Sequence, residues 1–165
     1  MVGLVRDVQF ENEDTMTNDE YTSRIEAGKY PKGGLVPLDS PFSDDRGDIQ
    51  NLVLKPMTSV AVITSKKGSV RANHYHKSDW HYAHIISGRI LYFEREIGSN
   101  VVSDPQEFVA GQMFFTPPMV EHSMLFAEDT TFITMAKNVR SHDSHEADLV
   151  RVEFITSDIA SKYVP

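Results

Sequence analysis

Short apolar stretches, each closed by turn-forming residues, recur along most of this 165-residue chain and constrain its fold more than any other feature. They begin at Leu35, and the breaks between them include "SKKGS", "IGSN", "SDP" and "TPP". Brief strands separated by turns are typical of antiparallel sandwiches and barrels. The pattern predicts strands over 49–54, 59–64, 71–76, 82–86, 89–95, 107–109, 112–115, 122–126 and 131–136. We therefore expect an all-β domain over 35–165, preceded by an irregular arm over 1–34.

The two ends of the chain give weaker signals. The amino-terminal arm is polar and acid-rich without an apolar period, so a short helix near Tyr21–Ala27 and disorder are both consistent with it. The tail is mixed, and either an edge strand around Val150–Ile155 or a short helix fits it. We interpret His142 and His145, in "SHDSHEAD", as parts of a solvated loop.

Composition narrows the possible partners. The 16 basic and 24 acidic residues give a formal net charge of -8, which disfavours nucleic acids and anionic membranes. The chain has no cysteine, which excludes disulfides, thiolate catalysis and cysteine-ligated zinc. No apolar run approaches the roughly 18 residues of a membrane span, and the first residues do not resemble a signal peptide. We expect a cytoplasmic protein whose partner is a small molecule, with no nucleic acid and no membrane.

Four of the seven histidines lie within eleven positions, in "HYHKSDWHYAH". Because residues two apart in a strand share a face, His74 and His76 project to the same side and form a good chelating pair. His81 begins the next expected strand, and His122 begins a much later one. Four imidazoles at about 2.0–2.1 Å would complete a zinc shell, whereas three plus water would leave a position open for chemistry. His84 is in odd register with His81, so we expect it on the opposite face.

The spacing of these histidines resembles the two sequence motifs of the cupin superfamily. The matching segments are Gly68-x5-His74-x-His76-x4-His81-x6-Gly88 and Gly111-x5-Pro117-x4-His122. The resemblance implies a double-stranded β-helix, or jelly-roll, barrel whose interior holds a metal bound by two histidines, a glutamate and a further histidine. Carried over, the metal ligands are His74, His76 and His122, with His81 at the glutamate position. The implied cofactor is a divalent transition metal, namely Zn, Fe, Ni or Mn.

The chain departs from the cupin pattern at three positions. His81 replaces the usual glutamate, and a shell of four histidines has no negative ligand, which changes metal preference and redox behaviour. His81 either binds the metal or only donates and accepts hydrogen bonds. Met119 stands where the second motif usually has glycine, and Phe126 where it often has asparagine.

Two further segments resemble cupins that process nucleotide-linked sugars. "FSDDRGDIQ" and "RANHYHK" are similar to segments of the dTDP-sugar 3,4-ketoisomerases and of the cupin domain in some bacterial capsule-precursor reductases. The ketoisomerases use their two strand histidines as acid–base groups without a metal, and often carry glutamine at the fourth position. The capsule-precursor domain keeps a glutamate there and binds zinc. This chain has neither residue, so metal-bound and metal-free versions both remain open.

The first functional hypothesis is an isomerase or epimerase acting on a nucleotide-linked sugar. Proton removal next to a carbonyl needs a base with a pKa near neutrality, which histidine supplies. The candidate catalytic residues are His76, which would take the proton, His74, which would return it, and Glu121, if its loop turns inward. Arg46 is a candidate for binding substrate phosphate, and a plain structural turn is the other interpretation of "RG".

Two alternatives belong to other classes of protein. A histidine-only shell with open positions suits an Fe(II)-dependent oxygenase, which oxygen consumption would reveal. A shell closed by all four histidines suits a non-catalytic binding module stabilised by its metal. The cupin resemblance also implies a homodimer, because such barrels commonly pair through strand edges and thereby protect them.

Overall fold

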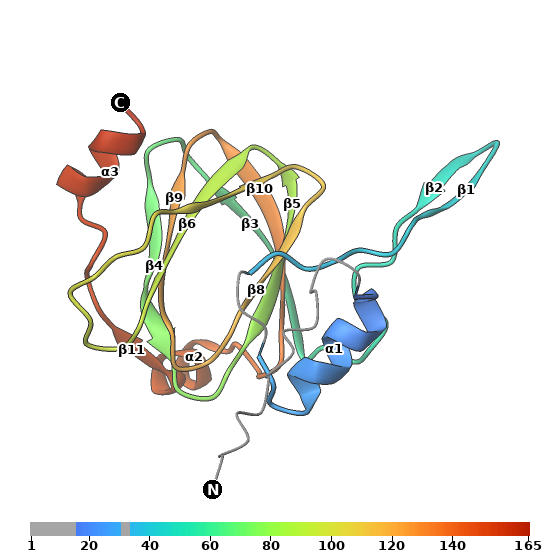
Figure 1. Ribbon diagram of the computed structural model, residues 1–165, viewed down its shortest axis with the longest axis horizontal. Helices are drawn as coiled ribbons and strands as arrows, with labels where there is room; N and C mark the ends of the chain where they lie inside the picture. Colours follow the sequence, from blue (N-terminus) through green and yellow to red (C-terminus); the bar gives the residue numbers. More distant parts are fainter. Residues whose placement is uncertain (1–15, 31–33) are drawn as a thin grey trace, which may run out of the picture.

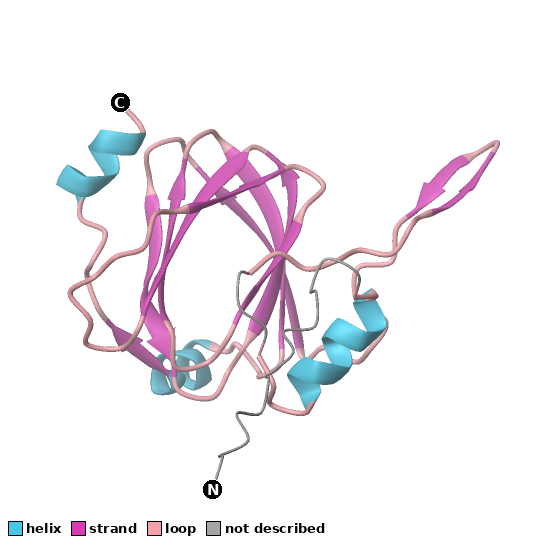
Figure 2. Cartoon of the chain, viewed as in Figure 1, coloured by secondary structure: helices cyan, strands magenta, loops and turns pink. Residues whose placement is uncertain are grey.

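The protein is described here by a computed structural model that covers residues 16–30 and 34–165. Two antiparallel sheets face each other as a sandwich, with strand orders β3-β10-β5-β8 and β11-β4-β9-β6-β7 (Figures 1 and 2). The strands are β1 Phe42–Asp44, β2 Gly47–Ile49, β3 Ser59–Ser65, β4 Val70–His76, β5 His81–Ser87, β6 Arg89–Arg95, β7 Gln106–Val109, β8 Met113–Thr116, β9 Glu121–Phe126, β10 Thr130–Ala136 and β11 Leu149–Arg151. The helices are α1 Asn18–Glu26, α2 His142–Asp148 and α3 Ser157–Tyr163. The all-β class predicted from the sequence is confirmed.

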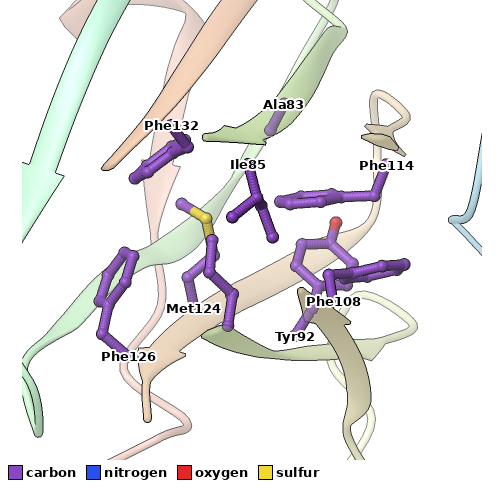
Figure 3. Packing of buried hydrophobic residues seen from close by; sticks show 9 residues of the cluster. Ala83, Ile85, Tyr92, Phe108, Phe114, Met124, Phe126 and Phe132 are labelled. Carbon is purple, nitrogen blue, oxygen red and sulfur yellow. The ribbon is translucent and has the colours of Figure 1, made fainter. Parts of the chain in front are cut away.

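An apolar core fills the space between the sheets at one end. It takes alternate residues from each strand, because successive side chains of a strand point to opposite faces. Figure 3 shows this packing, with its members drawn from both sheets. The buried members are Ala83, Ile85, Ile90, Tyr92, Phe108, Phe114, Met124, Phe126 and Phe132. Each large side chain buried in this way contributes about 1.5–3 kcal/mol to folding, so this cluster fixes how the sheets stack.

Helix α1 covers the outer face of the four-stranded sheet. It begins with a capping box, in which the Thr17 side chain accepts from the Glu20 backbone and the Glu20 carboxylate accepts from the Thr17 backbone. Its buried Tyr21 meets Phe115 of β8 edge to face, with ring centroids 6.4 Å apart. Of the alternatives that the sequence left open for the amino-terminal arm, the structure has the helix, while residues 1–15 and 31–33 lie outside the described part of the chain.

The tail covers the outer face of the five-stranded sheet. It supplies β11 as the edge strand expected near Val150, and then α3. Phe154, between these two elements, packs with Phe93 and Leu125, which point away from the space between the sheets. Of the helices in the described residues, none is long and apolar enough to cross a lipid bilayer.

The strand predicted over 49–54 is wrong. Strands β1 and β2 instead form a hairpin that projects from the body of the molecule (Figure 1), and all of their residues are exposed. Gly47 takes a φ of 129° just after the turn, which only glycine adopts without strain. The apolar residues Leu52 and Val53, which suggested a strand, lie in a loop and pack against the cluster around α1.

A β-bulge in β4 sets the register of the strand that carries two histidines. Ala72 and Asn73 have positive φ angles of 67° and 51°, and the pairing of β4 with β9 shifts by one residue between Ala72 and His74. The Asn73 amide holds this geometry, since it donates to the Ile155 carbonyl at 3.0 Å and accepts from the Ile155 amide at 3.2 Å. Beyond the bulge, His74 pairs directly with His122.

Candidate functional site

Four histidines from three strands meet between the sheets, at the end opposite the apolar core. The ring centroids of His74 and His122 are 4.7 Å apart, and those of His74 and His76 are 4.9 Å apart. His81 of β5 completes the group, with its ring 5.4 Å from His76. One ring nitrogen from each of His74, His76 and His122 lies within 4.8 Å of the others. The structure thus brings together all four histidines that the cupin spacing singled out.

Asp148, at the end of α2, holds the turn between β4 and β5. One carboxylate oxygen accepts from the amide and hydroxyl of Ser78, at 2.9 and 2.8 Å. The other accepts from the Asp79 amide at 3.2 Å and from Nδ1 of His76 at 3.1 Å. Burial opposes ionisation, but these hydrogen bonds outweigh it and hold the pKa of Asp148 below its usual value. A single carboxylate therefore fixes both the turn and one imidazole.

The hydrogen-bond partners of two histidines define which nitrogen carries the proton. His76 donates from Nδ1 to Asp148, and His122 donates from Nδ1 to the Val120 carbonyl at 3.1 Å. Since each partner is an acceptor, the neutral rings carry their lone pair on Nε2. Both Nε2 atoms are buried and have no hydrogen-bond partner among the described residues. Unpaired lone pairs of this kind, with the other nitrogen anchored, are typical of metal-ligating histidines.

Burial keeps the histidines neutral. It lowers the pKa of His74, His76 and His122 to about 3 each, and the positive charge that a neighbouring histidine would carry adds to the effect. The pKa of His81 falls well below its usual value, again mainly through burial and next through Arg140. Neutral imidazoles are the form that binds transition metals. The orphaned nitrogens of His76 and His122, together with His74, therefore fit a divalent transition metal.

Helix α2 brings a fifth histidine that the sequence reading missed. The segment 141–148 is solvated as predicted, but it is a helix and not a loop, because Ser141 caps it and accepts from the Ser144 amide. The ring of His145 lies 6.3 Å from that of His74 and 5.8 Å from that of His76. Burial lowers the pKa of His145 as well. The signal was present in the sequence, since Ser141 followed by acidic residues is a common helix start.

Glu94 of β6 is a second residue that the sequence reading missed. It pairs with His122 in the sheet, and paired residues share a face, so its side chain points to the inner side. Burial raises the pKa of Glu94, against the opposing effect of a hydrogen bond with Tyr92. A cavity of about 400 Å³ is lined by residues that include Glu94, Met119 and Val120. Glu94 thus places a carboxylate on the inner face of the strand next to His122, outside the tight group of three histidine nitrogens.

Met119 occupies a backbone conformation that favours glycine. Its φ is 58°, and its amide donates to the His76 carbonyl at 2.8 Å. A left-handed backbone at this position explains why the cupin pattern has glycine here. The loop before β9 is therefore tied directly to the strand that carries His76.

Two of the predicted site residues lie away from the histidines. Glu121 is buried and forms an ion pair with Arg95 on the outer face of the five-stranded sheet, where Arg95 stacks over Phe154 at 4.5 Å from its ring centroid. It follows that Glu121 and His122, as strand neighbours, point to opposite faces. Arg46 lies in the turn of the projecting hairpin, where its 84% exposed side chain pairs with Asp44. Its role in substrate binding stays a prediction.

His84 lies on the face opposite His81, as predicted. It pairs with Met113 and Ile133, and both of these residues pack in the outer cluster beneath α1. His84 therefore belongs to the packing of that cluster.

The sequence matches no protein-family model and no curated protein. Several solved structures share its fold. QdtA, a sugar 3,4-ketoisomerase from Thermoanaerobacterium thermosaccharolyticum solved with TDP, is 17% identical, with a TM-score of 0.55 over 74% of this chain and 90% of QdtA. ChmJ, a 3'-monoepimerase from Streptomyces bikiniensis solved with dTDP-quinovose, is 17% identical, with a TM-score of 0.59 over 76% of this chain and 73% of ChmJ.

A third structure is the capsular polysaccharide assembling protein CapF from Staphylococcus aureus. It is 20% identical, with a TM-score of 0.51 over 72% of this chain but only 32% of CapF. QdtA is a sugar 3,4-ketoisomerase, the first of the two groups of proteins that the sequence segments resemble. The chain therefore shares its fold with QdtA, ChmJ and one part of CapF.

Proposed function

We propose that this protein is an isomerase or epimerase that moves a proton next to the carbonyl of a nucleotide-linked sugar. The observation that carries the proposal is the pair of buried, unpartnered Nε2 atoms on His76 and His122, set beside an inward-facing carboxylate. Lone pairs without partners are costly to bury, so a site that keeps them is built to meet a ligand. The shared fold with QdtA and ChmJ supports the choice of substrate class.

We propose further that His74, His76 and His122 hold a divalent transition metal. When bound, such a metal would polarise the substrate carbonyl and stabilise negative charge on its oxygen. An imidazole that binds a metal cannot also accept the substrate proton, so the base must be another group. Glu94 suits this role because burial raises its pKa and because it faces the inner side of the sheet on the strand next to His122. His145 is a further imidazole close to His74 and His76, with ring centroids 6.3 and 5.8 Å from theirs.

The proposal is tested with protein purified without a metal-affinity tag. Elemental analysis should find one transition metal per chain, and His76→Ala and His122→Ala should each abolish it. The metal-loaded protein is then incubated in D2O with TDP-4-keto-6-deoxyglucose, a compound that a QdtA variant binds. NMR should show deuterium replacing the hydrogen next to the carbonyl, and Glu94→Gln should slow this exchange by roughly 100-fold. Metal-loaded protein that exchanges no hydrogen and forms no isomer would refute the proposal.

An Fe(II)-dependent oxygenase is the second candidate, and the absence of a carboxylate from the closest set of possible ligands favours it. Among the described residues, the tight three-histidine group contains no acidic member. Three neutral ligands leave open positions on iron. Oxygen uptake that requires Fe(II) and the His74 side chain would favour this function over the isomerase.

We also propose that the protein forms a homodimer through β3. This strand ends the four-stranded sheet, and Val60 and Val62 on it are 66% and 68% exposed. An open apolar edge strand tends to pair with another chain. Light scattering should give twice the mass calculated for one chain, and Val62→Lys should halve it, whereas Val101→Lys, at another exposed valine, should leave it unchanged.

A further inference from the structure

Arg140 fixes the hydrogen-bond polarity of His81. Arg140 follows β10, and its Nη2 lies 2.8 Å from Nδ1 of His81. A guanidinium group has N–H donors and no acceptor, so Nδ1 of His81 must accept. The neutral ring then carries its hydrogen on Nε2. This follows from the identity of the partner, which cannot act as an acceptor in any orientation.

Arg140 is itself held from several sides. Its Nε donates to the Asp79 carboxylate at 3.0 Å, and its Nη2 lies 3.0 Å from the same oxygen. Asp79 is buried, and its second oxygen accepts from the Asn138 amide at 2.9 Å. The backbone amide of Arg140 donates to the Ser59 hydroxyl at 2.9 Å. Because a buried carboxylate needs its cation, Arg140 cannot rotate away from His81 without leaving Asp79 unpaired.

The polarity of His81 is opposite to that of its neighbours. Nδ1 of His76 and of His122 faces an acceptor, so both rings present a lone pair on Nε2. Nδ1 of His81 faces a donor, so this ring presents an N–H. A nitrogen that carries hydrogen cannot bind a metal, and the remaining nitrogen is occupied by Arg140. The group of four histidines therefore divides into ligands and a donor.

We infer that His81 is the hydrogen-bond donor of the site, that it is not a metal ligand, and that Arg140 is its positioning residue. This inference rests on the proposed function. When the base removes the proton next to the substrate carbonyl, the electron pair moves onto the carbonyl oxygen, and His81 Nε2–H stabilises that oxygen without itself transferring a proton. A fixed donor aimed at a developing oxyanion is a common source of rate enhancement. The metal would then be bound by three histidines, and His81 would contact the substrate instead of the metal.

The first test is the ring nitrogen spectrum of the full-length, 15N-labelled protein, with and without zinc. In zinc-free protein, His81 should show a bare Nδ1 and a protonated Nε2, and His76 and His122 should show the reverse. His81 should keep its pattern when zinc is added. In the double variant Arg140→Met with Asp79→Asn, which leaves no unpaired buried carboxylate, the pattern of His81 should change, and Arg140→Lys should restore it. A zinc-dependent shift of His81 Nε2 to the bare form would overturn the inference.

The second test uses glutamine, whose amide can accept from Arg140 and donate to the substrate. His81→Gln should keep one zinc per chain, whereas His76→Gln should weaken zinc binding by more than about 10-fold. On the sugar nucleotide, His81→Gln should retain exchange within roughly 10-fold of the parent, and His81→Leu should lose about 100-fold or more in kcat with zinc still bound. Loss of zinc in His81→Gln would show that His81 is a ligand. Absence of exchange in every variant, with the nitrogen pattern as expected, would refute only the proposed function.

Discussion

The space between the sheets has two ends that are built from the same strands, and burial has opposite effects on stability at these two ends. Along β9 the inward residues are His122, Met124 and Phe126, so two steps of two residues lead from the site to the apolar core. At the core end burial is favourable in itself, because it removes apolar surface from water. At the histidine end burial leaves two ring nitrogens without partners and suppresses protonation. Burial therefore stabilises the folded protein at the core end and destabilises it at the histidine end.

The largest expected effect comes from pH and acts on the histidine end. The folded-state pKa values of His74, His76 and His122 are about 3, below the usual 6.5, so the unfolded chain binds protons first. Their contribution to stability is complete above pH 6.5 and is lost progressively as the pH falls toward 3. Each histidine should cost about 1.4 kcal/mol per pH unit in that window. Urea unfolding of metal-free protein at pH 7.5, 6 and 5 measures the slope. A free energy of unfolding that stays constant across this pH range would contradict the burial of these histidines.

A change at the core end should cost nearly as much and should not depend on pH. Phe132→Ala removes a fully buried ring from the apolar cluster and should destabilise the protein by about 3–5 kcal/mol. Urea unfolding at pH 7.5 and pH 6 should give the same loss. A loss that varied with pH would mean that the two ends are not independent.

Replacing a buried ring at the histidine end should change the free energy of unfolding in the opposite direction. His122→Leu replaces a buried ring with an unpaired nitrogen by an apolar side chain, so metal-free protein should gain about 1–2 kcal/mol at pH 7.5. It should also lose metal binding, and its stability should depend less steeply on pH than that of the parent. Destabilisation comparable to that of Phe132→Ala would remove the contrast between the two ends.

The smallest effect is expected in the loop beside the site. Met119 holds a φ of 58° and is 54% exposed, so Met119→Gly should relieve strain and change stability by about 1 kcal/mol or less in the stabilising direction. Thermal unfolding measures it, with Met119→Ala as the matched control that removes the same side chain and keeps the strain. If both variants behave alike, the backbone of this loop is not under strain.

The sequence predicted the parts of the site that depend on local geometry. His74 and His76 share a face because the bulge in β4 ends before His74, which leaves the two-residue period intact between them. The same period places Glu121 opposite His122, and its role as a base required an inward turn of the loop, whereas its side chain pairs with Arg95 on the outer face. The apolar run over 49–54 predicted a strand, but only Leu52 and Val53 of this run are partly buried, and they pack from a loop against the cluster around α1. Local pattern cannot distinguish these two ways of covering apolar surface.

The parts that could not be predicted depend on contacts between distant segments. Arg140 lies 59 residues from His81, and its partner Asp79 gives no sign of the contact in the sequence. Glu94 enters the site only because β6 pairs with β9 in one particular register. Such pairings are fixed by the packing of the two sheets as a whole.

The bonds of Asp148 have a consequence for how the protein is made. This residue fixes the turn after β4 and one histidine near the middle of the chain, yet it is synthesised more than sixty residues later, with a sequence separation of 72 from His76. On the ribosome, the strands that carry the histidines leave the exit tunnel well before the group that orients them. The site therefore stays incomplete until Asp148 has also emerged, and a chain cut short before Asp148 would contain every proposed metal ligand but not the carboxylate that aligns His76.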